Sequence, residues 1–391
     1  MNVHIEKSKG KGKVTAPPSK SMAHRLLICA GLSKGKSIVH GVSNSEDVEA
    51  TLDCLRSLGV KYETDGDTVT IEGADIRNSV PKNALACRES GSTLRFFIPI
   101  ALLSGKNVIL TGSDTLLKRP MSVYETIASE DGFDFLKCAN RLMVKGPLKA
   151  RNYRVPGNIS SQFISGLLFA LPLLESDSEI EIVPPIESRS YIELTIDSLR
   201  TFGVNVFWKD ENTLSVPGNQ EYAGKEVTVE GDYSNAAFFA ALNALGSEIE
   251  IEGLKPDSLQ GDKVYEKHIK SLLKGTPTIH LSDCPDLGPI LFGVAAAKFG
   301  GIFTGTKRLK MKESDRGNVM AQELKKFGTD VTVHEDTIVV FPRKFEKPEE
   351  ILDGHNDHRI VMTMAVLLTL TGGDISGAQA VALGGKNYVV Y

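Results

Sequence analysis

The chain has 391 residues, a length that favours two or three domains rather than one. Hydrophobic residues make up 41% and charged residues 24%, so a normal core can form and extensive disorder is not expected. The net charge of −4 argues against a nucleic acid or an anionic membrane as the main partner, although it permits a local cationic pocket.

Cysteine usage and the N-terminal residues favour a cytoplasmic protein. The five cysteines are scattered and form no CxxC motif or Cys/His cluster. Residues 1–16 lack the apolar segment of a signal peptide, and no apolar run reaches the ~20 residues that span a bilayer. We therefore expect reduced thiols, no membrane segment, no metal and no cofactor.

In chain order, the first expected elements are two strands around a glycine turn in residues 2–15. A buried helix follows in "PPSKSMAHRLLICAGLSKG", residues 17–35. Related segments recur, each with a Ser-, Asp- or Asn-rich start, ten or more mostly apolar residues, a polar break and a β-type segment. They begin at Arg88, Gly157, Gly231, Ser282 and Gly354.

A second element also recurs. Segments that begin at Leu55, Leu199 and Leu324 each end an amphipathic helix at a glycine, the usual residue after a helix C-terminus. Two strands joined by a polar turn follow each time. The repeat is thus helix, strand, helix and strand hairpin, in six variants, and Arg25 and Arg95 lie 70 residues apart in neighbouring copies.

The incomplete last copy suggests a two-domain organisation. After "GGDISG" no room remains for a hairpin, so the N-terminal strands are expected to complete this copy. Residues 1–18 and 229–391 then form one domain, and residues 19–228 form the other. The chain crosses between them near residues 18 and 228.

Cations stand at the starts of several buried helices. A helix N-terminus carries unpaired N–H groups and a partial positive charge, so a cation there is mildly unfavourable and indicates an anionic ligand. Lys20, Arg25, Arg95 and Arg359 occupy such places. Ser, Thr and Asp at the same starts are first of all ordinary caps, and this alternative stays open for each helix.

Loops after the strands add further charge. The solvated-surface interpretation remains open for "KRLKMK", although its cations again precede an amphipathic helix. Five or more cations with hydroxyls and two carboxylates suit a small substrate that carries at least two phosphate or carboxylate groups. The loop residues are Lys118, Arg119, Arg308, Lys310, Lys312, Glu313 and Arg316, and the second carboxylate is Asp286.

Motifs of other nucleotide- and metal-binding classes are missing from the sequence. "GKGKVTAPPSK" lacks the spacing of a phosphate-binding P-loop, and no GxGxxG follows a strand. His355 and His358 lie three residues apart but have no evident third ligand, so hydrogen bonding is favoured over metal binding.

Together these segments resemble the 5-enolpyruvylshikimate-3-phosphate synthase family over nearly the whole chain. "PPSKSMAHR" is similar to the family's SKS-x-x-x-R, and "ESGSTLRF" is similar to its G-[ST]-x-x-R segment. The remaining motifs occur in the family's order: "KRPM", "ISSQF", "ESRSYIEL", "DCPDLGP", "KESDR" and "GHNDHRIVM". His24, within the first motif, has no assigned part, and the family often has Asn there.

The resemblance implies an α/β fold of two similar domains, each of three βαβαββ-type repeats with buried parallel helices, joined by a two-strand hinge. It implies transfer of the enolpyruvyl group from phosphoenolpyruvate to the 5-hydroxyl of shikimate 3-phosphate, with release of phosphate, in the shikimate pathway to chorismate and aromatic amino acids. The active site would lie in the interdomain cleft. Residues 1–18 and 229–391 would supply the phosphoenolpyruvate side and the proton-transfer residues, and residues 19–228 the shikimate 3-phosphate side.

Site residues follow from the same motifs. The resemblance implies that shikimate 3-phosphate is held by Lys20, Ser21, Arg25, Ser160, Ser161, Gln162, Ser188, Tyr191, Asp286 and Lys312. It implies that phosphoenolpyruvate is held by Lys20, Gly91, Arg119, Gln162, Arg316, Arg359 and Lys386. Gly91 lies where the family meets the herbicide glyphosate, and a glycine there fits a glyphosate-sensitive type.

The implied catalytic residues are Asp286, Glu313 and Lys20. A base must take the proton of the 5-hydroxyl, and Asp286 or Lys312 suits this step. C3 of phosphoenolpyruvate must gain a proton and lose it again, for which Glu313 or Lys20 suits; the sequence leaves both choices open. A carboxylate among lysines has a lowered pKa, so Glu313 is expected to be a better base than acid.

Two alternatives accompany this hypothesis. The related transferase that acts on UDP-N-acetylglucosamine typically has a cysteine in the loop that corresponds to residues 113–121, and this loop has none. A catalytically impaired relative or an anion-binding protein is the second alternative, because Leu383 stands where the family has a lysine and Lys386 lies three residues later. We expect a monomer that binds small-molecule substrates.

Overall fold

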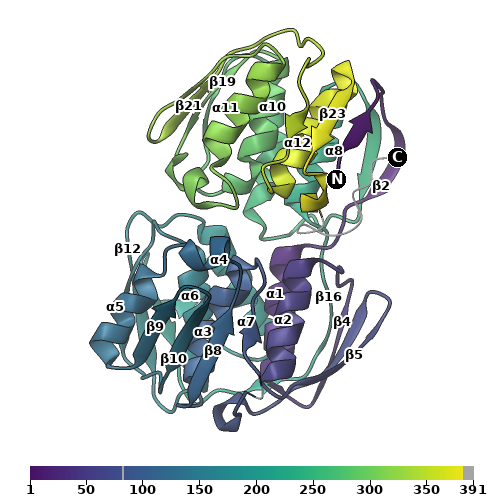
Figure 1. Ribbon diagram of the computed structural model, residues 1–391. Coiled ribbons are helices and arrows are strands. Elements are labelled where there is room, and N and C mark those ends of the chain that lie inside the picture. The colour runs from purple at the N-terminus through teal and green to yellow at the C-terminus, as the bar shows by residue number, and fades with distance from the viewer. Residues whose placement is uncertain (82, 382–391) are drawn as a thin grey trace. The chain divides into compact units, whose positions relative to one another are not determined.

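The computed structural model describes residues 1–81 and 83–381 (Figure 1). The chain divides into two compact units. We call Pro18–Glu230 the central unit, and Met1–Pro17 together with the chain from Gly231 onward the split unit. The chain therefore passes from one unit to the other after Pro17 and again after Glu230.

Each unit contains helices that are buried on nearly all sides, as the apolar segments predict. In α3 every residue except Ser92 is buried, because the sequence GSTLRFFIPIAL offers no polar face beyond its first turn. The buried helices of the central unit are α1 (Lys20–Leu32), α3 (Gly91–Leu102) and α6 (Ser161–Ala170). Those of the split unit are α8 (Tyr233–Ala244), α10 (Gly288–Ala297) and α12 (His358–Thr371), which pack against one another.

Amphipathic helices alternate with the buried ones along the chain. Helix α2 packs on strand β5, α5 on β9 and α11 on β20, so they cover sheets. The amphipathic helices are α2 (Glu46–Ser57), α5 (Ser122–Asp131), α7 (Arg189–Thr201), α9 (Tyr265–Leu272) and α11 (Arg316–Lys326), and a short helix α4 (Asp114–Lys118) precedes α5.

The central unit has three four-stranded sheets of one design. The strand after each buried helix pairs antiparallel with the inner strand of a hairpin and parallel with a further strand on its other side. In spatial order, the sheets are β16 (Glu226–Thr228), β4 (Lys36–His40), β6 (Thr68–Glu72), β5 (Lys61–Asp65); β7 (Leu85–Ala86), β8 (Asn107–Thr111), β10 (Arg141–Lys145), β9 (Asp134–Cys138); and β11 (Asn152–Pro156), β12 (Ser178–Val183), β14 (Thr213–Val216), β13 (Phe207–Trp208). Strands β15 (Tyr222–Ala223) and β3 (Ser33–Lys34) form a short parallel pair. In the sequence they directly precede β16 and β4 of the first sheet.

The split unit repeats this design once in full and twice in part. Its sheets are β18 (Thr278–His280), β19 (Gly301–Thr304), β21 (Thr337–Val340), β20 (Val331–Val333); β1 (Val3–Ile5), β23 (Gly373–Ser376), β22 (Leu352–Asp353); and β17 (Glu248–Glu252) with β2 (Lys11–Thr15). The expected completion of the last copy by both N-terminal strands is correct for β1, which pairs with β23, but wrong for β2. Strand β2 pairs parallel with β17 instead, because the first copy of the split unit lacks its own leading strand.

The three predicted helix stops are confirmed. Gly59, Gly203 and Gly328 follow the C-caps of α2, α7 and α11 with φ angles of 98°, 85° and 83°. Only glycine adopts this left-handed conformation without steric cost, which is why the residue recurs at the same place in each copy.

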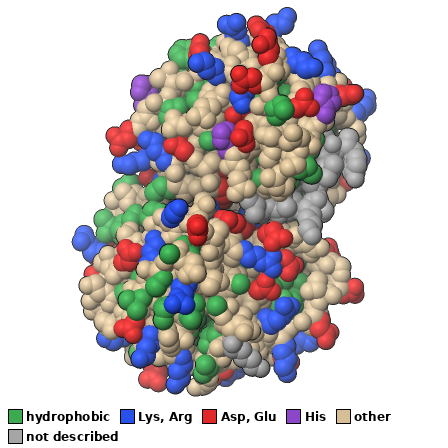
Figure 2. Space-filling model, in the orientation of Figure 1, with side chains coloured by type: hydrophobic (Ala, Val, Ile, Leu, Met, Phe, Trp, Pro, Cys, Tyr) green, Lys and Arg blue, Asp and Glu red, His purple; other side chains and the backbone are tan. Residues whose placement is uncertain are grey.

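Charge on the outside of the molecule is mixed. Figure 2 shows Lys and Arg side chains interspersed with Asp and Glu over the face drawn, in keeping with a net charge of −4. Among the described residues, no helix is long and apolar enough to cross a membrane.

Helices α3 and α6 approach each other closely in the core of the central unit. A Cβ atom at Gly166 would lie 2.4 Å from the Tyr124 hydroxyl and 2.6 Å from the Arg95 carbonyl oxygen. The same hydroxyl donates to the Arg95 carbonyl at 2.7 Å. A glycine is thus required where the two helices that carry Arg95 and Gln162 meet.

We predict that Gly166→Ala lowers the free energy of unfolding by about 1–3 kcal/mol, because the added methyl group overpacks this contact. Denaturant unfolding measures the loss. Gly275→Ala is the control, since a Cβ there meets no atom within 4 Å. Equal stability of the two variants would contradict the close helix packing.

Candidate functional site

Arg316 is the centre of a buried ion network in the split unit. Its side chain is 1% exposed and is the first residue of α11. The Nε atom donates to Asp357 Oδ2 at 2.8 Å, Nη1 to Asp286 Oδ1 at 2.8 Å and Nη2 to Glu313 Oε2 at 2.6 Å. Burial opposes the charge of Arg316, but these carboxylates, with Asp357 the strongest, raise its pKa.

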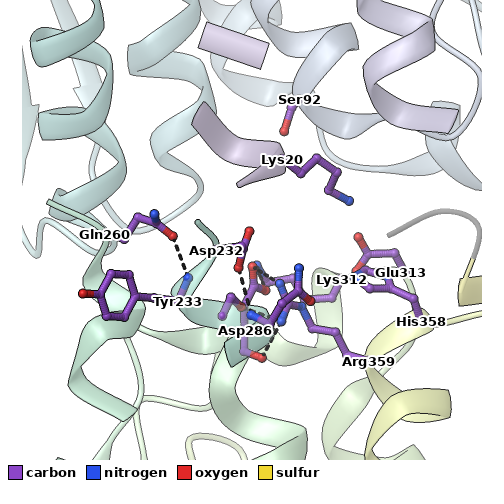
Figure 3. A network of polar contacts seen from close by, with 12 residues as sticks. Lys20, Ser92, Asp232, Tyr233, Gln260, Asp286, Lys312, Glu313, His358 and Arg359 are labelled. Carbon is purple, nitrogen blue, oxygen red and sulfur yellow. Dashed lines mark hydrogen bonds and ion pairs between the residues drawn. The ribbon is translucent and has the colours of Figure 1, made fainter. Parts of the chain in front are cut away.

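Within the described part of the chain, Asp286 accepts hydrogen bonds from Lys312, Arg316 and Arg359. It lies in the 3₁₀ turn Pro285–Leu287, just before α10. Lys312 Nζ donates to Oδ1 at 3.1 Å, and Arg359 Nη2 donates to Oδ2 at 3.4 Å, in addition to the bond from Arg316 (Figure 3). Burial by itself would raise the pKa of Asp286, but Arg359, Lys312 and Arg316 hold it well below its usual value.

Lys312 has the opposite tendency. Burial lowers the pKa of Lys312, and the nearby Arg316 lowers it further, against the opposing effect of Asp286. The pair Lys312–Asp286 thus combines a carboxylate held in its ionised form with an ammonium group that releases its proton more readily than an exposed lysine.

Arg359, the second residue of α12, is fixed from two sides. Asp357 caps α12 by accepting from Arg359 N at 3.0 Å, so the same carboxylate serves the helix and Arg316. Arg359 Nη1 donates to Ser234 Oγ at 2.6 Å and to the Asp286 carbonyl oxygen at 3.3 Å. Burial opposes the charge of Arg359, but Asp286 raises its pKa.

Asp262 adds a buried carboxyl to this network. It is 4% exposed, and its Oδ1 atom has no hydrogen-bond partner among the described residues. Burial is the main cause that raises the pKa of Asp262 to about 7; Asp286 and Asp232 add to it, and Arg359 and a hydrogen bond with Ser234 oppose it.

Arg25 is the main buried cation of the central unit. It is 2% exposed, and its donors reach Thr195 Oγ1 at 2.9 Å, the Ser21 carbonyl oxygen at 2.6 Å and the Tyr191 carbonyl oxygen at 3.0 Å. The guanidinium also lies 5.4 Å from the ring centre of Phe96. Burial lowers the pKa of Arg25 to about 10.

A second group of the central unit surrounds the start of α3. A Cβ atom at Gly91 would lie 2.8 Å from Arg119 Nη1, 3.6 Å from Arg95 Nη1 and 3.8 Å from Gln162 Oε1. Arg95 Nη1 donates to Gln162 Oε1 at 2.6 Å, and Gln162 Nε2 donates to Ser92 Oγ at 2.9 Å. The Nε atom of Arg119 is buried and has no hydrogen-bond partner among the described residues.

Lys20 and the serines stand at the starts of helices, as the sequence predicts. Lys20 begins α1, and its Nζ donates to Asp47 Oδ2 at 2.8 Å. Ser160 caps α6, whose first residue is Ser161, and Ser188 precedes α7 with a left-handed φ of 57°. The structure thus gathers the predicted residues of each unit near its helix N-termini, whereas Leu383 and Lys386 lie outside the described residues.

Sequence reasoning missed several partners of these residues. Asp357 was detectable, because an Asp that precedes His358–Arg359 at a helix start is a cap signal. The others, Asp47, Thr195, Ser234 and Asp262, have no local signal, since each is defined by a contact with a residue from another helix or loop.

Chemically, each unit offers cations and N–H groups to small anions. The described residues contain no group of three His, Cys, Asp or Glu side chains placed to hold a metal ion. Buried arginines with fixed geometry bind phosphate and carboxylate groups in two-pronged fashion. The carboxylates and Lys312 add groups that can exchange protons.

Comparisons with known proteins agree with this chemistry. The family model of EPSP synthase (3-phosphoshikimate 1-carboxyvinyltransferase) matches residues 5–384. The 3-phosphoshikimate 1-carboxyvinyltransferase of Clostridium perfringens is 41% identical over 393 residues, which cover 94% of this chain and 91% of the relative. That of Clostridium kluyveri is 39% identical over 384 residues, covering 93% and 90%. The solved EPSP synthase from Acinetobacter baumannii superimposes with a TM-score of 0.79 at 26% identity, covering 98% of this chain and 95% of that one.

Two units of repeated βαβαββ type with buried helices define an enolpyruvyl transferase fold, and the match to the solved structure agrees with it. Within that fold, the chain belongs to the EPSP synthase family.

We predict that Asp262→Asn stabilises the protein increasingly as the pH rises from about 4 to 7. The folded pKa of Asp262, about 7, lies above the ordinary value of 3.8, so the wild type loses stability as this carboxyl must ionise. The gain should reach about 1–4 kcal/mol above pH 7, because a pKa difference of one corresponds to about 1.36 kcal/mol.

Denaturant unfolding of both proteins at pH 4, 6 and 8 measures this difference. Asp257→Asn is the matched control, because the Asp257 side chain is 78% exposed. A gain for Asp262→Asn that is the same at every pH would show that the carboxyl does not titrate in this range.

Proposed function

We propose that this protein transfers the enolpyruvyl group of phosphoenolpyruvate to the 5-hydroxyl of shikimate 3-phosphate, with release of phosphate. It thereby serves the shikimate pathway to chorismate and aromatic amino acids. The observation that carries the proposal is Asp286, an ionised carboxylate bonded to Lys312, Arg316 and Arg359. Its chemistry suits proton transfer between two anionic substrates, and the family membership supplies the reaction.

Shikimate 3-phosphate is proposed to bind mainly to the central unit. Arg25 supports this assignment, because among the described residues its buried guanidinium donates to neutral oxygen atoms, so its positive charge is not offset by a carboxylate and can attract a phosphate. The proposed ligands are Lys20, Ser21, Arg25, Ser160, Ser161, Gln162, Ser188 and Tyr191 from this unit, with Asp286 and Lys312 from the split unit.

Phosphoenolpyruvate is proposed to bind cations of both units. Arg119 supports this, because its buried Nε has no partner among the described residues and its Nη1 lies against the backbone of Gly91, where a side chain would obstruct it. The proposed ligands are Lys20, Gly91, Arg119, Gln162, Arg316, Arg359 and Lys386.

The reaction consists of an addition and an elimination. In the addition, the 5-oxygen bonds to C2 of phosphoenolpyruvate while the 5-hydroxyl loses its proton and C3 gains one. In the elimination, C3 loses a proton and the bond from C2 to the phosphate oxygen breaks. The buried arginines stabilise the charge of the intermediate and of the departing phosphate.

Proton transfers are assigned to the residues that the resemblance implies. Either Asp286 or Lys312 takes the proton of the 5-hydroxyl. The low pKa of Asp286 keeps it ionised but makes it a weak base, whereas the lowered pKa of Lys312 favours the neutral amine that can accept a proton. Glu313, bonded to Arg316 at 2.6 Å, or Lys20 exchanges the proton of C3. No cofactor takes part in this scheme.

Neither alternative from the sequence is favoured. The family model and the curated relatives are those of 3-phosphoshikimate 1-carboxyvinyltransferase, so the transferase for UDP-N-acetylglucosamine is not supported. The same relatives speak against a merely anion-binding protein. The position of the family's C-terminal lysine, Leu383 here, lies outside the described residues.

A cytoplasmic location and a monomeric state belong to the same proposal. The five cysteines are free, and four of them are buried, as expected for a protein of a reducing compartment. Size-exclusion chromatography with light scattering tests the oligomeric state, and a mass above one chain would overturn the monomer.

The proposed activity is tested by phosphate release from phosphoenolpyruvate in the presence of shikimate 3-phosphate. We predict turnover that requires both substrates and falls by about a hundredfold or more in Asp286→Asn, in line with the usual contribution of acid–base groups. Asp283→Asn, at an exposed neighbouring position, is the control and should keep wild-type kcat. Absence of phosphate release above background in the wild type would refute the function.

We predict that Gly91→Ala raises the KM for phosphoenolpyruvate about tenfold, the effect of roughly 1.4 kcal/mol of lost binding. The added Cβ, 2.8 Å from Arg119 Nη1, must displace this guanidinium. Steady-state kinetics should show that the KM for shikimate 3-phosphate changes by less than about twofold. An equal rise in both KM values would contradict the assignment of Arg119.

A further inference from the structure

His24 is a buried residue that the proposed reaction does not use. It lies on α1, one turn after Lys20, and is 1% exposed. Its Nδ1 atom lies 2.7 Å from Thr51 Oγ1 of α2, the helix beside α1 in Figure 1. A polar ring in such a place is costly unless its hydrogen bond serves the structure or the site.

The contact with Thr51 begins a chain of hydroxyl groups that leads to the start of α3. Thr51 Oγ1 lies 2.9 Å from Thr93 Oγ1, and Thr93 Oγ1 donates to Ser90 Oγ at 2.7 Å. Ser90 caps α3 and also accepts from Thr93 N at 3.2 Å. These hydroxyl-bearing residues are at most 1% exposed, so water does not replace their hydrogen bonds.

The number of available protons fixes the direction of this chain. The single hydroxyl proton of Thr93 goes to Ser90, at the shorter distance of 2.7 Å. In the contact between Thr51 and Thr93, where either oxygen can be the donor, we therefore assign the donor role to Thr51. Thr51 then has no proton for His24, and His24 must donate to it from Nδ1. The imidazole is therefore the tautomer with a proton on Nδ1 and a bare Nε2.

Two further observations agree with this tautomer. His24 Nε2 is buried and has no hydrogen-bond partner among the described residues. This fits a nitrogen that carries no proton and therefore needs no acceptor. Burial, together with the charges of Lys20 and Arg25, lowers the pKa of His24 to about 3, so the ring is neutral at ordinary pH.

We propose that His24 is a positioning residue that holds the start of α3 in its binding conformation through Thr51, Thr93 and Ser90. The chain ends one residue before Gly91, the residue against which Arg119 lies. It also passes the backbone of Asp47, whose side chain holds Lys20 at 2.8 Å. The buried N–H group of His24 thus helps to fix both the start of α3 at Gly91 and the backbone of Asp47, whose side chain holds Lys20.

The direction of the chain has a consequence for Ser90. Because Ser90 Oγ accepts from both Thr93 groups, its own hydroxyl proton points away from them. Reversal of the chain would turn this proton back toward Thr93. His24 therefore determines the orientation of the Ser90 hydroxyl group. This inference rests on the proposed function only where it names phosphoenolpyruvate as the affected ligand.

The test compares His24→Leu, His24→Asn and Thr51→Val. Leu fills the space without a donor, the Asn amide restores an N–H, and Val removes the hydroxyl that passes the hydrogen bond on. Thr201→Val is the matched control, because the Thr201 hydroxyl makes an exposed bond within its own helix. The readouts are kcat, the KM of each substrate, the melting temperature and 15N NMR of the imidazole.

We expect His24→Leu and Thr51→Val to raise the KM for phosphoenolpyruvate about tenfold, and that for shikimate 3-phosphate less than about twofold. His24→Asn should return the first value to within about threefold of the wild type. Thr201→Val should change neither. The 15N spectrum should show a protonated Nδ1 and a bare Nε2 from about pH 5 to 9, well above the pKa of His24.

The proposal is overturned if the kinetics are unchanged in both His24→Leu and Thr51→Val. It is also overturned if the two KM values rise equally and in proportion to the fall in melting temperature. An imidazole protonated on Nε2 would overturn it as well. If His24→Leu does not fold, Thr51→Val and His24→Asn decide the kinetic question. If the wild type releases no phosphate, the proposed function fails, while the NMR measurement still decides the direction of the chain.

Discussion

The ion network around the buried guanidinium of Arg316 fixes the positions of the charged residues in the split unit's site. An arginine without solvent is costly unless acceptors satisfy its donors, and acceptors of opposite charge offset the cost most strongly. Asp357, Asp286 and Glu313 supply these acceptors, and each of them also acts elsewhere. Asp357 caps α12, Asp286 bonds Lys312 and Arg359, and Glu313 is a proposed proton carrier. Loss of one carboxylate would therefore alter the position and charge of the remaining groups.

The central unit treats its buried arginine differently. Arg25 bonds two carbonyl oxygens and the Thr195 hydroxyl, and no carboxylate is paired with it in the part of the chain that the structure describes. Burial lowers its pKa, whereas that of Arg316 is raised. The split unit thus pairs its buried Arg316 with carboxylates, whereas the described contacts of Arg25 in the central unit are with neutral oxygen atoms.

Local signals allowed much of the fold to be predicted, and distant contacts did not. The stops at Gly59, Gly203 and Gly328 were predictable because a left-handed residue after a helix is a local requirement. The pairing of β2 with β17 was not, because Glu250 and Lys13, its partner in the ladder, are far apart in sequence and no residue pattern in β2 specifies a sheet. In the site, cations at helix starts were visible, whereas Ser234 and Asp262 become significant only through Arg359.

The two N-terminal strands give the protein an uneven order of assembly during synthesis. The central unit has all its strands once Glu230 has left the ribosome, whereas β1 must wait for β23, and His4 meets Asp374 across 370 residues. Closing so long a loop is entropically costly and slow. Folding of the central unit brings Pro17 close to Asp232, whose N–H donates to the Pro17 carbonyl at 2.7 Å. The loop that closes when β1 meets β23 then consists only of the segments from Ile5 to Pro17 and from Asp232 to Gly373, roughly 150 residues instead of about 370. The central unit, whose sequence is inserted between the two segments of the split unit, therefore helps the split unit to fold by bringing these segments together.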